Sequence, residues 1–287
     1  MLSHIMDSSF NAHPTLGAFL IGLFFSCCLF GISTAQTYTY STRCQEDGIW
    51  IKLMVIAIWL CELGQYICIC QAAYNLAVIN FGHPSTLSTI SSSIDAVILI
   101  SAIIITVAQS FFIERLRRIS KGHLILTVCW ALALTRFAML VALSSRMMKM
   151  KNTDSANVLR ETKGLYTTAL IAGAAVDFFI AFYLVHHIKF SKPTSRFQST
   201  SDMIDRVAMW AIETGLLTRL TESTLLVFFI AMPENWVWQT LFACISRIFS
   251  NTLLATLNGR TQFRERVLRR GSQEQRFLMV RTIRTAL

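Results

Sequence analysis

Seven ionisable side chains stand inside long apolar stretches of the sequence. A charge at the centre of a membrane helix costs about 2.5–3.5 kcal/mol, so such residues should face a bundle interior and pair with one another. Carboxylates in this setting are also the groups that bind ions or relay protons. The seven residues are Glu62, Arg136, Asp177, Glu213, Arg219, Glu222 and Arg247.

Helical spacing suggests first partners for some of these charges. Arg219 lies near the middle of its apolar stretch, and Glu222 follows three residues later, on the same helix face. We therefore predict that Arg219 is buried and paired, with Glu222 as its nearest candidate. Glu62 and Asp177 are the alternative partners, from other helices of the bundle.

Small and amide residues accompany two of the charges. Ala169, Gly173 and Asp177 recur every four residues, which predicts a close helix contact beside Asp177. Arg247, Asn251 and Asn258 line one stripe of the last apolar stretch. Such a network either fixes helix register or forms a ligand, ion or proton site, and both interpretations stay open. The candidate intramembrane polar network comprises Glu62, Arg136, Asp177, Arg219, Glu222, Arg247 and Asn251.

Signatures of reaction chemistry are missing from the sequence. No His, Cys and carboxylate cluster has metal-ligand spacing, and there is no phosphate-binding glycine loop or nucleophile elbow. No apolar stretch carries a lysine in its core, so a Schiff base within the membrane has no candidate amine. We therefore expect no catalytic residue, no metal, no cofactor and no enzymatic activity.

The elements that carry these residues are predicted to be membrane-spanning helices. The chain is 54% hydrophobic and 15% charged, whereas soluble domains carry roughly 25% charged residues. Stretches of about 20 apolar residues are long enough for one bilayer crossing. The predicted class is all-α, a polytopic transmembrane helix bundle formed by residues 16–257. Its seven spans are expected at residues 16–35, 53–79, 96–113, 123–145, 164–186, 207–232 and 236–257.

The distribution of lysine and arginine predicts the orientation of the bundle. With seven spans, one side carries 18 basic residues and the other carries 5, and the richer side is expected in the cytosol. Residues 1–15 would then be an extracellular N-terminus and residues 258–287 a basic cytosolic tail. One segment disagrees, because Arg146–Lys163 holds all five basic residues of the outer side. If the span that contains Arg136 failed to insert, the C-terminal half would reverse.

The tail and the net charge of +10 point to the membrane surface as a partner. Phe263 and Val267 lie four residues apart among arginines, which favours an amphipathic helix on anionic inner-leaflet lipids over a solvated tail. No nucleic-acid recognition motif accompanies the charge, so nucleic acid is not expected as a partner. The arginines of this tail are Arg260, Arg264, Arg266, Arg269 and Arg270.

Several hydrophobic motifs resemble one family along nearly the whole chain. They are LLATLNGR at residues 253–260, TGLLT at 214–218, AMPEN at 231–235, QSFFIERLRRIS at 109–120, and residues 22–40 with Gln36. The chain is similar to a fungal family of seven-pass membrane proteins that is catalogued as a domain of unknown function. The resemblance implies seven spans, a fungal source and no assigned activity. It carries over no catalytic or ligand residue.

Function is predicted only by analogy at the level of the fold. Seven spans, an outer N-terminus and a basic cytosolic tail favour a receptor-like or sensory protein with an unknown small ligand or a cytosolic signalling partner. The alternatives are a small-solute or ion transporter that uses the buried carboxylates Glu62 and Asp177, and a non-catalytic membrane scaffold. No internal repeat is visible, which argues weakly against a transporter.

Overall fold

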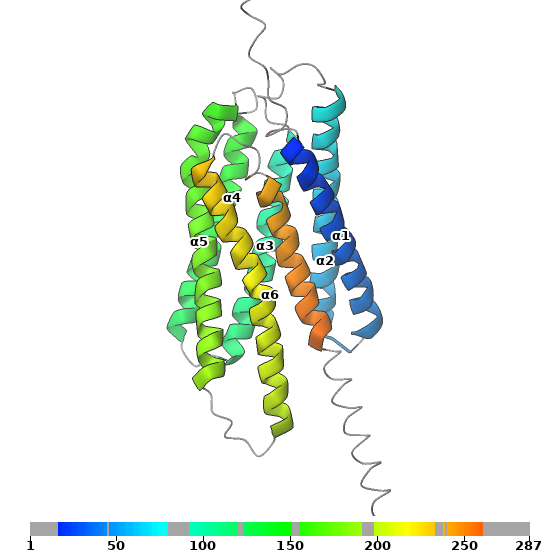
Figure 1. Cartoon of the computed structure of the whole chain (residues 1–287), viewed down its shortest axis with the longest axis vertical. Coiled ribbons are helices and arrows are strands. Elements are labelled where there is room, and N and C mark those ends of the chain that lie inside the picture. The colour runs from blue at the N-terminus through cyan, green and yellow to red at the C-terminus, as the bar shows by residue number, and fades with distance from the viewer. Residues whose placement is uncertain are drawn as a thin grey trace, which may run out of the picture.

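A bundle of long helices forms the part of the chain that the computed structural model describes (Figure 1). This part comprises residues 17–44, 46–79, 92–119, 123–150, 155–190, 198–232, 238 and 240–260, and it contains no strand. The all-α class is therefore confirmed. The helices are α1 (Ala18–Arg43), α2 (Ile49–Tyr74) with its π-helical extension η2 (Asn75–Ile79), α3 (Ser92–Ile119), α4 (His123–Lys149), α5 (Ser155–Phe190) and α6 (Gln198–Ala231). The orange helix in Figure 1, Thr240–Arg260, carries no label there and is called the last helix.

Six of the described helices are long and apolar enough to cross a membrane, so the chain is a multi-pass membrane protein. Helix α6 is not among the six, and its side chains are described only from Gly215 onward. The six spans are Phe19–Arg43, Ile49–Ile79, Ser93–Arg117, His123–Lys149, Arg160–Tyr183 and Thr240–Arg260.

The helices extend beyond the apolar stretches that predict them. Helix α5 already begins at Ser155, inside the segment predicted to be an outer loop. The last helix continues to Arg260, three residues past the predicted end of its span at Leu257. Hydropathy finds only the part of a helix that faces hydrocarbon, whereas backbone hydrogen bonds and ordinary helix propensity continue into polar flanking turns.

Helix α1 and the last helix run in the same direction along the bundle (Figure 1). Three side chains of the last helix, each seven residues apart, donate hydrogen bonds to backbone carbonyls of α1. A seven-residue repeat keeps one face of a helix against its partner over several turns. The bonds are Cys244 Sγ to Gly22 O at 3.9 Å, Asn251 Nδ2 to Leu29 O at 3.1 Å and Asn258 Nδ2 to Gln36 O at 2.8 Å.

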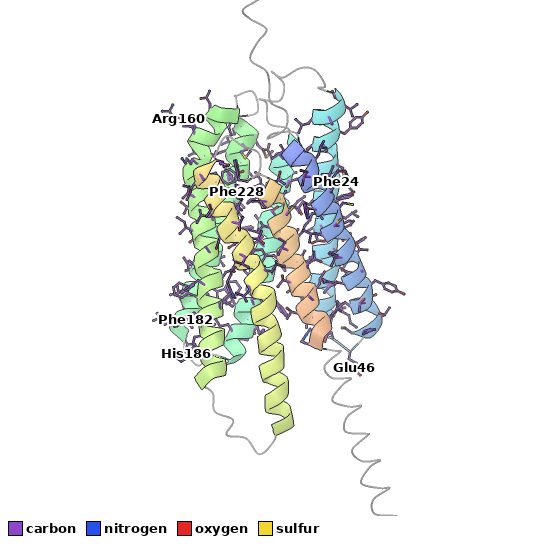
Figure 2. All side chains as sticks on the ribbon, viewed as in Figure 1. Phe24, Glu46, Arg160, Phe182, His186 and Phe228 are labelled. Atoms are coloured by element: carbon purple, nitrogen blue, oxygen red, sulfur yellow. The ribbon has the colours of Figure 1, made fainter. Side chains whose placement is uncertain are left out.

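The outer surface of the bundle is apolar (Figure 2). Phe24 and Phe182 point outward and are 70% and 60% exposed, as expected for side chains that face lipid. Polar side chains mark the two ends of the bundle, with Arg160 at one end and Glu46 and His186 at the other. The second of these ends, where α1, α3, α5 and the last helix finish, is called the Arg260 end.

Candidate functional site

A buried ion pair joins α4 to α6. Nη2 of Arg136 lies 2.5 Å from Oε1 of Glu222, and the two side chains are only 2% and 1% exposed. The Arg136 guanidinium also lies 5.5 Å from the ring centroid of Phe249 on the last helix. Removing one partner of such a pair leaves an uncompensated charge in a medium of low dielectric constant, which is strongly destabilising.

Gly173 on α5 makes room for Arg136. A Cβ atom at residue 173 would lie 2.6 Å from Cζ of Arg136, which is closer than Cβ atoms come to other heavy atoms in proteins. Ala169, one turn earlier on the same face, is also buried. The small residues beside Asp177 therefore do lie against a neighbouring helix, and the group they admit is the guanidinium of Arg136.

Arg219 does not pair with Glu222, so that predicted pair is wrong. It lies instead beside Asp177, one of the two alternative partners, and it is partly buried, not buried as predicted. Nε of Arg219 donates a hydrogen bond to the backbone carbonyl oxygen of Asp177 at 3.1 Å. Residues three apart share a helix face, but long side chains on that face can still reach different neighbouring helices. Here Arg219 reaches α5, whereas Glu222 reaches Arg136 on α4.

Asp177 stands at the centre of this group of charges. Its buried side chain interacts electrostatically with Arg136, Arg219 and Glu222. Two arginines and two carboxylates thus meet where α4, α5 and α6 approach one another. These four residues, Arg136, Asp177, Arg219 and Glu222, are called the α6 charge cluster.

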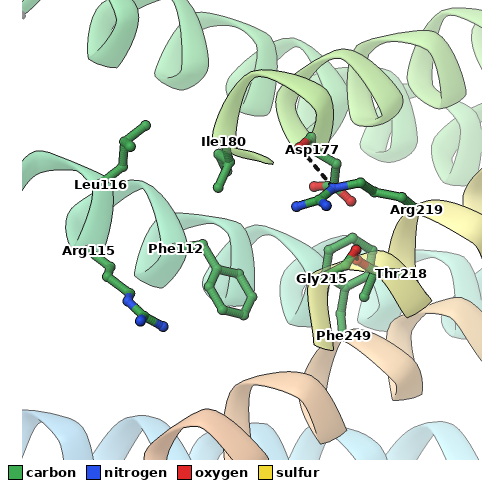
Figure 3. Close-up of a pocket in the computed structure, with 9 residues that line it drawn as sticks. All are labelled: Phe112, Arg115, Leu116, Asp177, Ile180, Gly215, Thr218, Arg219 and Phe249. Atoms are coloured by element: carbon green, nitrogen blue, oxygen red, sulfur yellow. Dashed lines mark hydrogen bonds between the residues drawn. The ribbon is translucent and has the colours of Figure 1, made fainter. Parts of the chain in front are cut away.

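A small cavity of about 30 Å³ adjoins the α6 charge cluster (Figure 3). Figure 3 shows Arg219 extending from α6 toward Asp177, with Phe249 of the last helix beside them. Arg115 lines the same cavity from α3 but points away from that pair. One water needs roughly 10–15 Å³ of such volume, so the cavity has room for about two water molecules.

A second buried group of charges joins α2 to the last helix. Ser250 donates a hydrogen bond to Oε1 of Glu62, and Glu62 also interacts electrostatically with Arg247. Glu62 and Arg247 are both fully buried. The prediction placed these two charges in the bundle interior, and the structure brings them into one group.

Two aromatic rings cover the guanidinium of Arg247. Its Cζ lies 5.7 Å from the ring centroid of Phe30 on α1 and 5.8 Å from that of Tyr66 on α2. Among the described residues, none of its guanidinium nitrogens has a hydrogen-bond partner. A desolvated cation–π contact contributes about 2 kcal/mol, so the rings and Glu62 together compensate this charge.

Serines that the sequence analysis missed complete the second group. Nε2 of Gln65 hydrogen-bonds Oγ of Ser101 on α3 at 2.7 Å and Oγ of Ser246 on the last helix at 2.9 Å. Ser246 and Ser250 lie four residues apart on either side of Arg247. That spacing indicates a polar face on the last helix. Serine is common in membrane helices, so two serines alone are weak evidence for a polar site.

The other candidate residues belong to neither group of charges, although Asn251 Nδ2 donates a hydrogen bond to the backbone carbonyl of Arg247 at 2.8 Å. Asn251 is partly buried and holds the last helix against α1, as described above. Arg260 forms an ion pair with Asp47 at 3.3 Å. The remaining tail arginines, Arg264, Arg266, Arg269 and Arg270, lie outside the described residues, and the side chain of Glu213 does too. Among the described residues, no group of three His, Cys, Asp or Glu side chains could hold a metal ion.

Comparison with known protein families shows a match in the C-terminal part of the chain. Residues 173–262 match the model of a family of unknown function (DUF6534). This segment covers less than a third of the chain, but it contains Gly173, Asp177, α6 and the last helix. No curated protein and no solved structure matches the chain.

Proposed function

We propose that this protein is a receptor-like, sensory seven-pass membrane protein in which α6 responds to a small polar ligand. One observation carries the proposal: α6 presents Arg219 to α5 and Glu222 to α4, beside a cavity that adjoins the α6 charge cluster. A fungal source is part of the proposal, on the strength of the sequence resemblance alone.

The parallel course of α1 and the last helix supports a seventh crossing. Helix α5 runs toward the Arg260 end, whereas the last helix begins at the opposite end (Figure 1). Helix α6 lies between them in the chain and runs back along the bundle, which supports the proposed seventh crossing. Its 34 residues span about 51 Å, more than the roughly 30 Å of hydrocarbon in a bilayer.

The basic bias supports an orientation with the N-terminus outside and the C-terminus in the cytosol. The Arg260 end is the side with 18 lysines and arginines in the predicted topology. In this orientation, the helices that carry the α6 charge cluster have their Arg260 ends on the cytosolic side.

A ligand can shift α6 only if it makes different contacts in two arrangements of that helix. A carboxylate suits Arg219, and an ammonium group suits Asp177, so an amino acid or a similar zwitterion matches the pair. The cavity of about 30 Å³ holds water but not such a ligand. Binding would therefore require α6 to move away from α5, which couples occupancy to a change in the bundle.

A second candidate function is transport of the same class of solute. Asp177 favours it, because a buried carboxylate beside a water-sized cavity is a common feature of ion and solute pathways. Glu62 is the other carboxylate of this hypothesis. A non-catalytic scaffold is the third candidate, in which both groups of charges only fix the helices in place.

A binding screen followed by a flux assay distinguishes the three candidates. The probes are the standard amino acids and small carboxylates, and the first readout is the melting temperature of the purified protein. We expect at least one probe to stabilise the native protein but not Arg219→Gln. Arg117→Gln is the matched control, because this exposed residue lies at the Arg260 end and pairs only locally with Glu114.

The outcome assigns the function. A probe that binds through Arg219 and does not cross proteoliposome membranes supports the sensory protein. A probe that binds and is taken up into proteoliposomes replaces it with the transporter. If no probe gives a shift that depends on Arg219, the sensory proposal is contradicted in favour of the scaffold.

A further inference from the structure

A cavity of about 310 Å³ opens at the Arg260 end, between α2, α3 and the last helix. Trp50, Met54 and Phe111 give it an apolar wall. Arg115 and Arg260 contribute cationic groups to the same lining, and Glu114, which binds Arg117 at 2.6 Å, contributes a carboxylate. The cavity is separate from the small cavity of the α6 charge cluster, although Arg115 borders both.

The two arginines lie close enough to repel each other. The positive charge of Arg260 acts unfavourably on that of Arg115. Arg260 also has a carboxylate partner, because Asp47 binds it at 3.3 Å while accepting a hydrogen bond from Tyr40. An anion that contacted both guanidinium groups would relieve their repulsion, and phosphate is the anion that arginine recognises best.

An apolar groove continues from this cavity between α2 and α3. It is a second hollow of about 340 Å³ that shares Trp50 and Met54 with the first and reaches Cys61 on α2. Trp50 and Cys61 are 11 positions apart, which is about 16 Å along a helix. That length is close to half of the roughly 30 Å hydrocarbon core, the depth of one leaflet. Its lining is apolar throughout: Trp50, Leu53, Met54, Ala57, Ile58, Cys61, Ile103, Ile104 and Val107.

We propose that this surface binds an anionic phospholipid. The headgroup phosphate lies between Arg115 and Arg260, and one acyl chain follows the groove from Trp50 toward Cys61. Trp50 is 81% exposed at the mouth of the groove, where tryptophan is enriched at membrane interfaces. A soluble phosphate would contact the arginines but leave the apolar groove unoccupied. A phospholipid contacts both, so the groove favours a lipid. The proposal is independent of the proposed function and of the orientation of the bundle.

Native mass spectrometry of the purified full-length protein tests this site. The probes are phosphatidylserine, phosphatidylcholine and glycerol 3-phosphate, each titrated in detergent. We expect one phosphatidylserine molecule to remain bound under conditions that remove phosphatidylcholine from the protein. We expect no retention of glycerol 3-phosphate. Arg115→Gln with Arg260→Gln should weaken phosphatidylserine binding by about 25-fold, because each basic residue near an anionic membrane surface contributes roughly fivefold.

Two further variants separate the site from general charge attraction. Arg264→Gln with Arg266→Gln removes the same number of charges from the tail and should leave the tightly bound lipid in place. Ala57→Phe fills the groove without altering charge and should reduce lipid retention, which gives a second test if the arginine variant folds poorly. Equal retention of both phospholipids, or retention unaffected by both the arginine and the Ala57 variants, would overturn the proposal. Strong binding of glycerol 3-phosphate would assign the site to a soluble anion instead.

Discussion

The guanidinium group of Arg136 occupies the space that a side chain at Gly173 would need. A Cβ at residue 173 would lie 2.6 Å from Cζ of Arg136 and 3.1 Å from its Nε. This close approach lets α4 and α5 pack tightly while a buried cation lies between them. It also aligns Arg136 with Glu222 on α6, so one glycine supports a contact among three helices.

Gly173→Ala should destabilise the protein because the added methyl group displaces Arg136 from its position. Overpacking of this kind costs about 1–3 kcal/mol. Gly164→Ala is the matched control on the same helix, since a Cβ there would have no atom within 4 Å. Helix propensity alone makes that change neutral or favourable by up to about 1 kcal/mol. Thermal melts in detergent compare the two variants, and equal melting temperatures would refute the role of Gly173.

Arg136 and Glu222 should be strongly coupled in a double-mutant cycle. Arg136→Leu and Glu222→Leu each leave one buried charge uncompensated, at a cost of about 3–5 kcal/mol. The double variant should therefore lose much less stability than the sum of the two single variants. Arg219→Leu combined with Glu222→Leu is the control cycle, and its losses should be closer to additive because these two side chains contact different helices. Stronger coupling in the control cycle would show that Glu222 pairs with Arg219, as helical spacing predicts, and not with Arg136.

The sequence predicts the helices of this bundle better than it predicts their contacts. Apolar length alone locates six of the membrane-spanning helices, and the cost of membrane burial predicts that Glu62 and Asp177 face inward. The partner of each charge depends on how helices are ordered and rotated around one another. Because these helices are apolar on nearly every side, periodicity does not reveal that rotation. The local rule for residues three apart therefore favours Arg219 with Glu222, whereas tertiary packing joins Glu222 to Arg136.

Asn251→Ala and Asn258→Ala should each weaken the packing of the last helix on α1. Each substitution removes a side-chain hydrogen bond to an α1 carbonyl, and such bonds in membrane proteins contribute about 0.6 kcal/mol on average, up to about 1.7 kcal/mol. Thr42→Ala is the control, because its hydroxyl bonds only within the exposed end of α1. The measurement is hydrogen exchange of the α1 amides, which should quicken in both asparagine variants and remain unchanged in the control. Unaltered exchange in both asparagine variants would show that these bonds contribute nothing to the packing.

The proposed orientation predicts that an epitope at the N-terminus is accessible on intact cells and that one at the C-terminus becomes accessible only after permeabilisation. An odd number of crossings requires this difference, and the basic bias gives its direction. Antibody labelling before and after permeabilisation measures it. Tags that behave alike would require an even number of crossings and would contradict the crossing proposed for α6.

The distance between α6 and α2 tests most directly whether α6 is the responsive helix. Spin labels replace the exposed side chains Leu217 and Ile56, in a background without native cysteines, and pulsed electron resonance gives the distance distribution. Arg219→Gln removes the bond to the Asp177 carbonyl, and it should shift or broaden the distribution by about 1–2 Å, the size of helix shifts at packed interfaces. Arg117→Gln should leave the distribution unchanged. Identical distributions in the native protein and Arg219→Gln would show that this contact does not govern the position of α6, and would contradict a sensory role for that helix.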